Sequence, residues 1–113
     1  NLVIEPTEAL TVIDVNTAKS VSKKTSEETY LKTNLEAAEA IAVQLRLRNL
    51  SGIIIVDFID MKEEESRKAL LAAMRQAVAA DPVKTVLVDM TPLGLVELTR
   101  KKIRRPLHEQ VRG

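Results

Sequence analysis

The run of apolar residues from Gly52 to Ile59 constrains this fold more than any other feature of the 113-residue chain. Four consecutive positions, 53–56, are β-branched, and β-branched side chains favour the extended backbone of a strand. A continuous apolar run, rather than an alternating one, indicates a central, parallel strand of an α/β sheet. This run includes Asp57, and a second apolar run contains Asp14. Both carboxylates are therefore expected where open α/β sheets expose their binding crevice.

Helical and extended patterns alternate along the rest of the chain, which predicts a mixed α/β fold with a largely parallel central sheet flanked by two long helices. The expected order is strand, strand, helix, strand, helix, strand, helix. The segments are two strands joined as a hairpin (2–4 and 9–15, the first at the sheet edge), an exposed loop (17–26), a helix (27–50), a strand (52–59), a helix (60–80), a strand (84–89), a turn (91–94) and a short helix (95–102).

Both long helices are predicted from apolar residues that recur at spacings of three and four. These residues are Leu31, Leu35, Ala38, Ala42 and Leu45 in the first helix, and Ala69, Leu70, Ala73, Met74 and Ala77 in the second. The residues that fit helix ends are Thr25 with Glu28 and Ser51 with Gly52 for the first helix, and Asp60 with Glu63 and Asp81 with Pro82 for the second.

Composition limits the classes of protein to which this chain can belong. A hydrophobic content of 45% suits a single domain, residues 1–113, with a core of its own. The chain has no cysteine, so it holds no disulfide and no thiolate zinc site, which fits a cytoplasmic location. No stretch approaches the roughly 20 apolar residues of a membrane span. Because the chain opens on Asn1 rather than on a methionine, we expect it to be a fragment of a longer protein.

Asp14, Asn16 and Asp57 form a candidate metal site. Residues two apart in a strand face the same side, so Asp14 and Asn16 are expected to point into one space, next to Asp57. Two carboxylates and a carboxamide suit Mg²⁺, or Mn²⁺, because these ions prefer oxygen ligands and keep several waters. In the alternative interpretation, turn amides or helix N-termini satisfy Asp14 and Asp57, and Asp60 is a helix cap.

A basic segment places five cations in six positions: Arg100, Lys101, Lys102, Arg104 and Arg105. Such a charge density can neutralise several phosphates of RNA, although a solvated helix end would look the same. The net charge of +1 does not by itself indicate nucleic-acid binding, and the two aromatic residues, Tyr30 and Phe58, offer no platform for stacking bases. His108, the only histidine, fits a surface residue better than a ligand or a general base.

Several strings of this chain, taken together and in order, resemble the ribonuclease E/G family. They are TEALTVIDVN (7–16), EET (27–29), KTNLEAA (32–38), QLRLR (44–48), IVDFIDM (55–61) and GLVELTR (94–100). The resemblance covers nearly the whole chain and corresponds to the DNase I-like subdomain of the family's catalytic region. The segment 90–94 is more similar to ribonuclease G-type or Gram-positive members than to the longer ribonuclease E proteins.

The resemblance implies a Mg²⁺-dependent endoribonuclease that hydrolyses single-stranded RNA in RNA processing and decay. By their motifs, Asp14 and Asp57 would hold the ion that activates water and stabilises the scissile phosphate, and Asn16 would assist. Family enzymes also carry an S1 RNA-binding domain, a 5′-phosphate-sensing region and a paired-cysteine zinc link that joins subunits into a homo-oligomer. This sequence contains none of them, so we expect it to be a metal-binding core without efficient catalysis of its own.

Two other classes of function remain open from the residues. Asp57 at the end of an apolar central strand could be the phosphoacceptor of a receiver-like signalling domain. Such domains usually have two adjacent acids at the end of the first strand, whereas in this chain Asp14 is followed by Val15 and Asn16. A labile phosphate adduct after incubation with a small phosphodonor would favour that class. A non-catalytic structural module would show no metal dependence at all.

Overall fold

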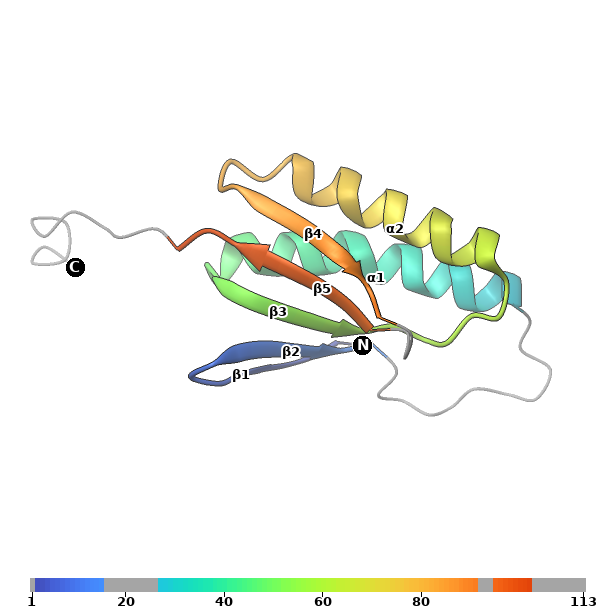
Figure 1. Cartoon of the computed structure of the whole chain (residues 1–113), viewed down its shortest axis with the longest axis horizontal. Helices are drawn as coiled ribbons and strands as arrows, with labels where there is room; N and C mark the ends of the chain where they lie inside the picture. The colour runs from blue at the N-terminus through green and yellow to red at the C-terminus, as the bar shows by residue number, and fades with distance from the viewer. Residues whose placement is uncertain (1, 16–26, 92–94, 103–113) are drawn as a thin grey trace, which may run out of the picture.

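A computed structural model describes residues 2–15, 27–91 and 95–102. In these ranges the chain forms one sheet and two helices, and both helices lie on the same side of the sheet (Figure 1). The elements are β1 (Val3–Pro6), β2 (Leu10–Asp14), α1 (Glu27–Leu47), β3 (Gly52–Asp57), α2 (Glu64–Ala79), β4 (Thr85–Met90) and β5 (Leu95–Arg100). Neither helix of the described ranges is long and apolar enough to cross a membrane.

The sheet has the strand order β1-β2-β3-β5-β4, so β3 is central, as its apolar run predicts. Only β2 and β3 are parallel, and the helix α1 makes the crossover between them. The pairs β1–β2, β3–β5 and β4–β5 are antiparallel. The α/β class is therefore confirmed, whereas the prediction of a largely parallel sheet is wrong.

The last element differs most from expectation, because 95–102 is not a helix but includes the strand β5. Its side chains alternate: Val96, Leu98 and Arg100 are buried, whereas the intervening residues are half-exposed. That period of two belongs to a strand, and β5 inserts between β3 and β4 with ladder partners on both sides. The described part of the chain therefore has two successive strands, β4 and β5, after α2 rather than a strand and a helix.

The hairpin and both long helices are confirmed, with one helix end in a different place. Strand β1 pairs with β2 at the sheet edge, and Thr7 closes the turn through hydrogen bonds with Leu10. Helix α1 ends through Asn49, whose φ of 49° is left-handed, and the amide of Leu50 donates to the carbonyl of Leu45 at 3.0 Å. This is a Schellman-type end, so the predicted end at Ser51-Gly52 lies too late. The loop 17–26, the cap residue Thr25 and positions 92–94 lie outside the described residues.

Among the described residues, the helices cover one face of the sheet and no element covers the other (Figure 1). Its helix-facing side chains, including Ile54, Val56, Val96 and Leu98, are fully buried against α1 and α2. On the opposite face Val12 is 37% exposed and Ile53 is 40% exposed. Strand β3 is therefore buried on one face rather than on both, and residues that alternate with the core point to an open surface.

Candidate metal centre

Asp14 and Asp57 are ladder partners at the carboxyl ends of two parallel strands, β2 and β3. Neighbouring strands lie about 4.8 Å apart, so the two carboxylates are within reach of one cation. The amide of Val15 donates to the carbonyl of Asp57 at 3.0 Å and extends the pairing past the last register position. The predicted proximity of the two aspartates, 43 positions apart in sequence, is therefore confirmed.

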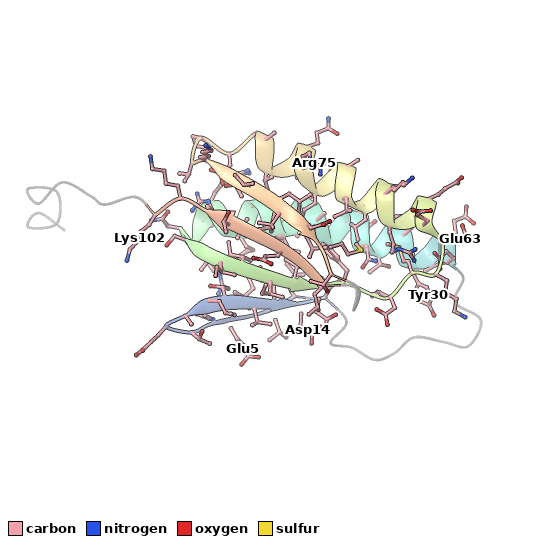
Figure 2. All side chains as sticks on the ribbon, viewed as in Figure 1. Glu5, Asp14, Tyr30, Glu63, Arg75 and Lys102 are labelled. Atoms are coloured by element: carbon pink, nitrogen blue, oxygen red, sulfur yellow. The ribbon has the colours of Figure 1, made fainter. Side chains whose placement is uncertain are left out.

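Both carboxylates lie on the open face of the sheet. In β2 the residues Thr11 and Ile13 point to the core, and in β3 the residues Ile54 and Val56 do so, which leaves Asp14 and Asp57 half-buried on the other side. Figure 2 shows Asp14 at the lower edge of the sheet, away from the helices. A ligand can therefore approach the pair from solvent without displacing core residues.

The electrostatics of this edge favour a cation. Partial burial raises the pKa of Asp57 above its ordinary value of 3.8, and the charges of Asp14 and Asp60 raise it further. Like charges this close are relieved either by protonation or by a bound cation. The described residues contain no group of three or more His, Cys, Asp or Glu side chains placed to hold a metal ion. The donor set is thus two carboxylates, which fits an ion that keeps several waters, such as Mg²⁺.

Asp60 is not the helix cap that the sequence predicts. Helix α2 begins at Glu64, and the residue at its N-cap position, Glu63, makes no side-chain capping bond. The carboxylate of Glu27, from the start of α1, instead accepts hydrogen bonds from the amides of Lys62 at 3.1 Å and Glu63 at 2.8 Å. The amide of Glu63 is the main cause that lowers the pKa of Glu27. Asp60 is consequently exposed beside Asp57.

Two residues that fasten the connection between β3 and α2 escaped the sequence analysis. One is Glu27, whose carboxylate binds the connection just before α2, 35 positions away in the chain. The other is Asn34, a fully buried polar residue of α1 that binds the backbone of Ile59. Asn34 is adjacent to the apolar stripe predicted for α1 but is not part of it. The one available signal was a polar residue next to that stripe, which can mark a buried hydrogen bond. Arg67 adds bonds from its Nη1 to the carbonyls of Met61 and Lys62, at 2.8 and 3.0 Å.

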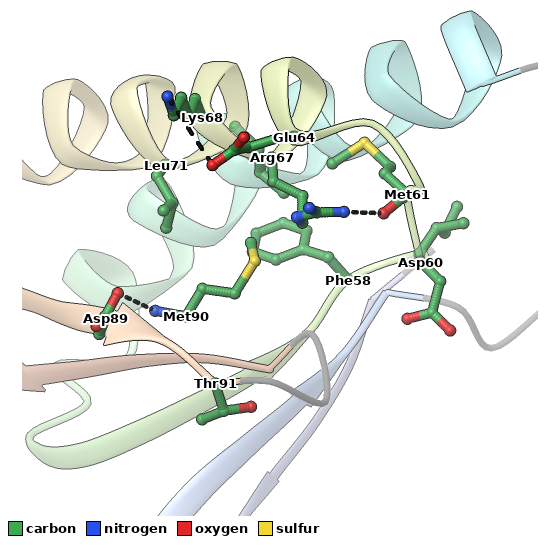
Figure 3. A pocket seen from close by; sticks show the side chains of 12 residues that line it. Phe58, Asp60, Met61, Glu64, Arg67, Lys68, Leu71, Asp89, Met90 and Thr91 are labelled. Atoms are coloured by element: carbon green, nitrogen blue, oxygen red, sulfur yellow. Dashed lines mark hydrogen bonds and ion pairs between the residues drawn. The ribbon is translucent and has the colours of Figure 1, made fainter.

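A pocket of about 790 Å³ lies next to this connection, between α2 and the end of β4 (Figure 3). Apolar side chains such as Phe58, Leu71 and Met90 line it together with charged residues of both signs, including Arg67 and Asp89. Asp60 belongs to the lining as well. The pocket therefore adjoins the candidate metal centre but faces the helix side of the sheet.

Arg100 does not belong to an RNA-binding surface in this structure, contrary to the prediction for the basic segment. Its side chain is 2% exposed and makes a 2.8 Å salt bridge from Nε to Oδ2 of Asp81, whose side chain is also 2% exposed. Its Nη1 donates to Oδ1 of Asn49 and to the carbonyl of Leu50, at 3.1 and 2.9 Å. The guanidinium group of Arg100, on β5, therefore connects the ends of α1 and α2, and its contacts are structural.

Lys101 and Lys102 are exposed after the end of β5. Because Arg100 pairs with Gly52 and Leu95 pairs with Asp57, these lysines lie at the opposite end of β3 from the aspartates. Five residues of extended chain separate the two ends by about 17 Å. The other predicted site residues, Asn16, Arg104 and Arg105, and also His108, lie outside the described residues.

Comparison with known proteins gives a consistent result over nearly the whole chain. A sequence model described as the Ribonuclease E/G family matches residues 1–103. Ribonuclease G of Salmonella typhimurium is 52% identical over 103 residues, which cover 91% of this chain and 21% of the relative. Ribonuclease G of Escherichia coli K12 is 49% identical over 106 residues, or 94% of this chain and 22% of the relative.

A relative with another name is similar to the same extent. Ribonuclease E of Nostoc sp. is 49% identical over 108 residues, which cover 96% of this chain and 16% of the relative. The chain thus spans about a fifth or less of the length of the curated relatives that it matches.

Proposed function

The chain belongs to the ribonuclease E/G family, and on that premise we propose that it is the metal-binding core of an endoribonuclease acting on single-stranded RNA in RNA processing and decay. One observation carries the proposal: Asp14 and Asp57 are side by side at the ends of parallel strands, on an open face. The chain would correspond to the DNase I-like subdomain of such an enzyme, with Asn16 as a third participant.

The chemistry assigned to the two aspartates is the binding of Mg²⁺, or of Mn²⁺, through their oxygen atoms. A cation bound there would supply the charge that activates water and offsets the charge building on the scissile phosphate. Asp57 must be ionised to bind it, and the neighbouring acids oppose that ionisation by raising its pKa. Cation binding is therefore coupled to proton release, so affinity rises with pH through the range in which Asp57 titrates.

Efficient cleavage would need more than this chain. We expect the parent protein to contribute an S1 domain and a 5′-phosphate-sensing region that hold RNA across the acids, and to act as a homo-oligomer in the cytoplasm. Remote contacts supply the binding energy that positions a substrate, and their loss lowers the rate of the chemical step. The isolated chain would therefore bind the cation while cutting RNA slowly.

The exposed lysines of the basic segment, Lys101 and Lys102, are proposed RNA phosphate contacts, together with Arg104 and Arg105. Replacing Lys101 and Lys102 by alanine should weaken binding of single-stranded RNA and reduce the slope of log affinity against log salt by roughly 0.7 per lost contact. Arg100 is excluded from this set because Asp81 already binds it in the interior. An unchanged slope would remove the lysines from the interface.

A receiver-like role for Asp57 has less support. Receiver domains are doubly wound parallel sheets, whereas three of the four strand pairings in the described sheet are antiparallel. A purely structural module gives no reason for two aspartates to pair at the ends of neighbouring parallel strands, where the charge of Asp14 raises the pKa of Asp57 in addition to the effect of burial.

Manganese-induced NMR line broadening tests the proposal. Mn²⁺ should broaden the resonances around Asp14 and Asp57 first, and Asp57→Asn should abolish that effect. Asp89→Asn is a matched control, since Asp89 is an exposed aspartate on another strand of the same sheet. Broadening centred away from Asp14 and Asp57, or unaffected by Asp57→Asn, would defeat the proposal.

A further inference from the structure

Asn34 is the most deeply buried polar side chain of the described residues, with an exposed fraction of 0%. Its Nδ2 donates to the carbonyl of Ile59 at 2.9 Å, and its Oδ1 accepts from the amide of Ile59 at 3.0 Å. One carboxamide thus satisfies both backbone groups of a residue 25 positions away. The arrangement imitates a strand neighbour, because a peptide group would offer the same donor and acceptor.

The position of this contact matters because the ladders of β3 end at Asp57. Up to that residue the backbone is held by β2 on one side and β5 on the other. Two residues later, Ile59 is partly buried, and buried backbone groups without partners are costly. Asn34 supplies from α1 the partner that the sheet provides to the residues before Asp57.

The residues after Ile59 are fastened as well. Glu27 binds the amides of Lys62 and Glu63, and Arg67 binds the carbonyls of Met61 and Lys62. Asp60 therefore lies between two anchored stretches (Figure 3). Its side chain is exposed, and its charge acts on Asp57. A short anchored connection fixes where the acidic side chains can point.

We propose that Asn34 is a positioning residue of the candidate metal centre, which holds the chain leaving β3 so that Asp57 stays beside Asp14 and Asp60 stays near Asp57. The expected effect on metal affinity rests on the proposed function, whereas the contact between Asn34 and Ile59 does not depend on it. Groups that orient metal-binding side chains without touching the ion commonly change affinity tenfold or more when removed. Without the carboxamide, both backbone groups of Ile59 would lose their partners, so the chain directly after Asp57 would be held less firmly and the side chain of Asp57 less well oriented.

The test compares Asn34→Ala and Asn34→Leu with Val78→Ala in the folded, metal-free chain. Asn34→Leu keeps nearly the same size but loses both the donor to the carbonyl of Ile59 and the acceptor for its amide, so it tests the idea even if Asn34→Ala fails to fold. Val78 is buried in α2 on the same core, and its truncation is a control for general loss of packing. We expect both Asn34 variants to shift the amide resonances of 57–60 and to speed hydrogen exchange at Ile59, whereas Val78→Ala should leave these signals in place.

Mn²⁺ titration of the same variants tests the consequence. Affinity should fall about tenfold in the Asn34 variants and stay within twofold of the parent chain in Val78→Ala. Unchanged amide signals at 57–60, or an equal loss of affinity in the control, would overturn the positioning role. A parent chain that binds no Mn²⁺ at Asp14 and Asp57 would instead overturn the proposed function, and the metal-free spectra would still decide whether Asn34 holds the connection.

Discussion

At the two ends of the central strand β3, the surroundings of an aspartate shift its pKa in opposite directions. At one end Asp81 is 2% exposed in its side chain and bound by Arg100, whose hydrogen bonds lower the pKa of Asp81. At the other end partial burial and two neighbouring acids raise the pKa of Asp57. At the first end an ion pair with Arg100 stabilises the charged form of Asp81. At the second end burial and the neighbouring carboxylates of Asp14 and Asp60 disfavour the charged form of Asp57.

The contrast separates a structural from a functional use of the same side chain. A buried carboxylate with its cation adds specificity to the packing of α1, α2 and β5, and breaking such a pair leaves an uncompensated buried charge. Neighbouring carboxylates repel one another, which costs stability in the metal-free chain, and perturbed acids of this kind are typical of functional sites. The difference predicts that substitutions at the two ends change stability in opposite directions.

The largest effect is expected from Asp81→Asn. This change leaves the guanidinium of Arg100 buried without its carboxylate, which should lower the free energy of unfolding by about 3–5 kcal/mol. Urea unfolding of the metal-free chain measures it. Asp89→Asn, at an exposed position of β4, is the control and should stay within about 0.5 kcal/mol of the parent. A small loss for Asp81→Asn would mean that the pair contributes little to holding the helix ends.

Asp57→Asn should act in the other direction and with a smaller magnitude. Removing one of the clustered charges relieves repulsion from Asp14, so the free energy of unfolding should stay equal or rise by about 0.2–1 kcal/mol. If Asp57 were a structural hydrogen-bond hub, the same change would cost about 1 kcal/mol or more. The full-length variant, assayed with Mg²⁺, should lose RNA cleavage. A destabilised chain together with normal cleavage would contradict the proposed role.

The pH dependence of these two effects sharpens the comparison. The folded pKa of Asp57 is above 3.8, so the gain from Asp57→Asn is full at neutral pH and disappears as the pH falls through that folded pKa. The folded pKa of Asp81 is below 3.8, so its stabilisation is present above 3.8 and is lost only as the pH falls through its lower folded pKa. Urea unfolding across acidic pH should therefore abolish the Asp57 effect first; the reverse order would refute the contrast.

The smallest effect is expected from Glu27→Ala. This change removes the carboxylate at the start of α1 that accepts hydrogen bonds from the two amides just before α2. Hydrogen exchange should become faster at the amides of Lys62 and Glu63, with the global fold retained. Glu28→Ala on the exposed side of α1 is the matched control and should leave both amides unchanged. Equal hydrogen-exchange rates of these two amides in both variants would show that the carboxylate of Glu27 does not hold the connection between β3 and α2.

Much of the fold and the meeting of Asp14 with Asp57 follow from local sequence patterns. The β-branched run locates β3, helical spacing locates both helices, and the two apolar runs ending near Asp14 and Asp57 predict that these residues meet. The prediction of a helix over 95–102 is wrong because an arginine is expected at the surface, whereas Arg100 occupies an inward position of the strand β5. An arginine indicates a surface unless its buried partner is known.

The sequence by itself determined where the chain is helical or extended in most segments, that it belongs to the α/β class, and which family motifs it carries. Only the tertiary structure decided that β5 separates β3 from β4, that Asp81 draws Arg100 into the interior, and that Glu27 and Asn34 serve residues far along the chain. The physical reason is that periodicity reports which face of an element is apolar, whereas a buried polar contact depends on a partner brought close by folding.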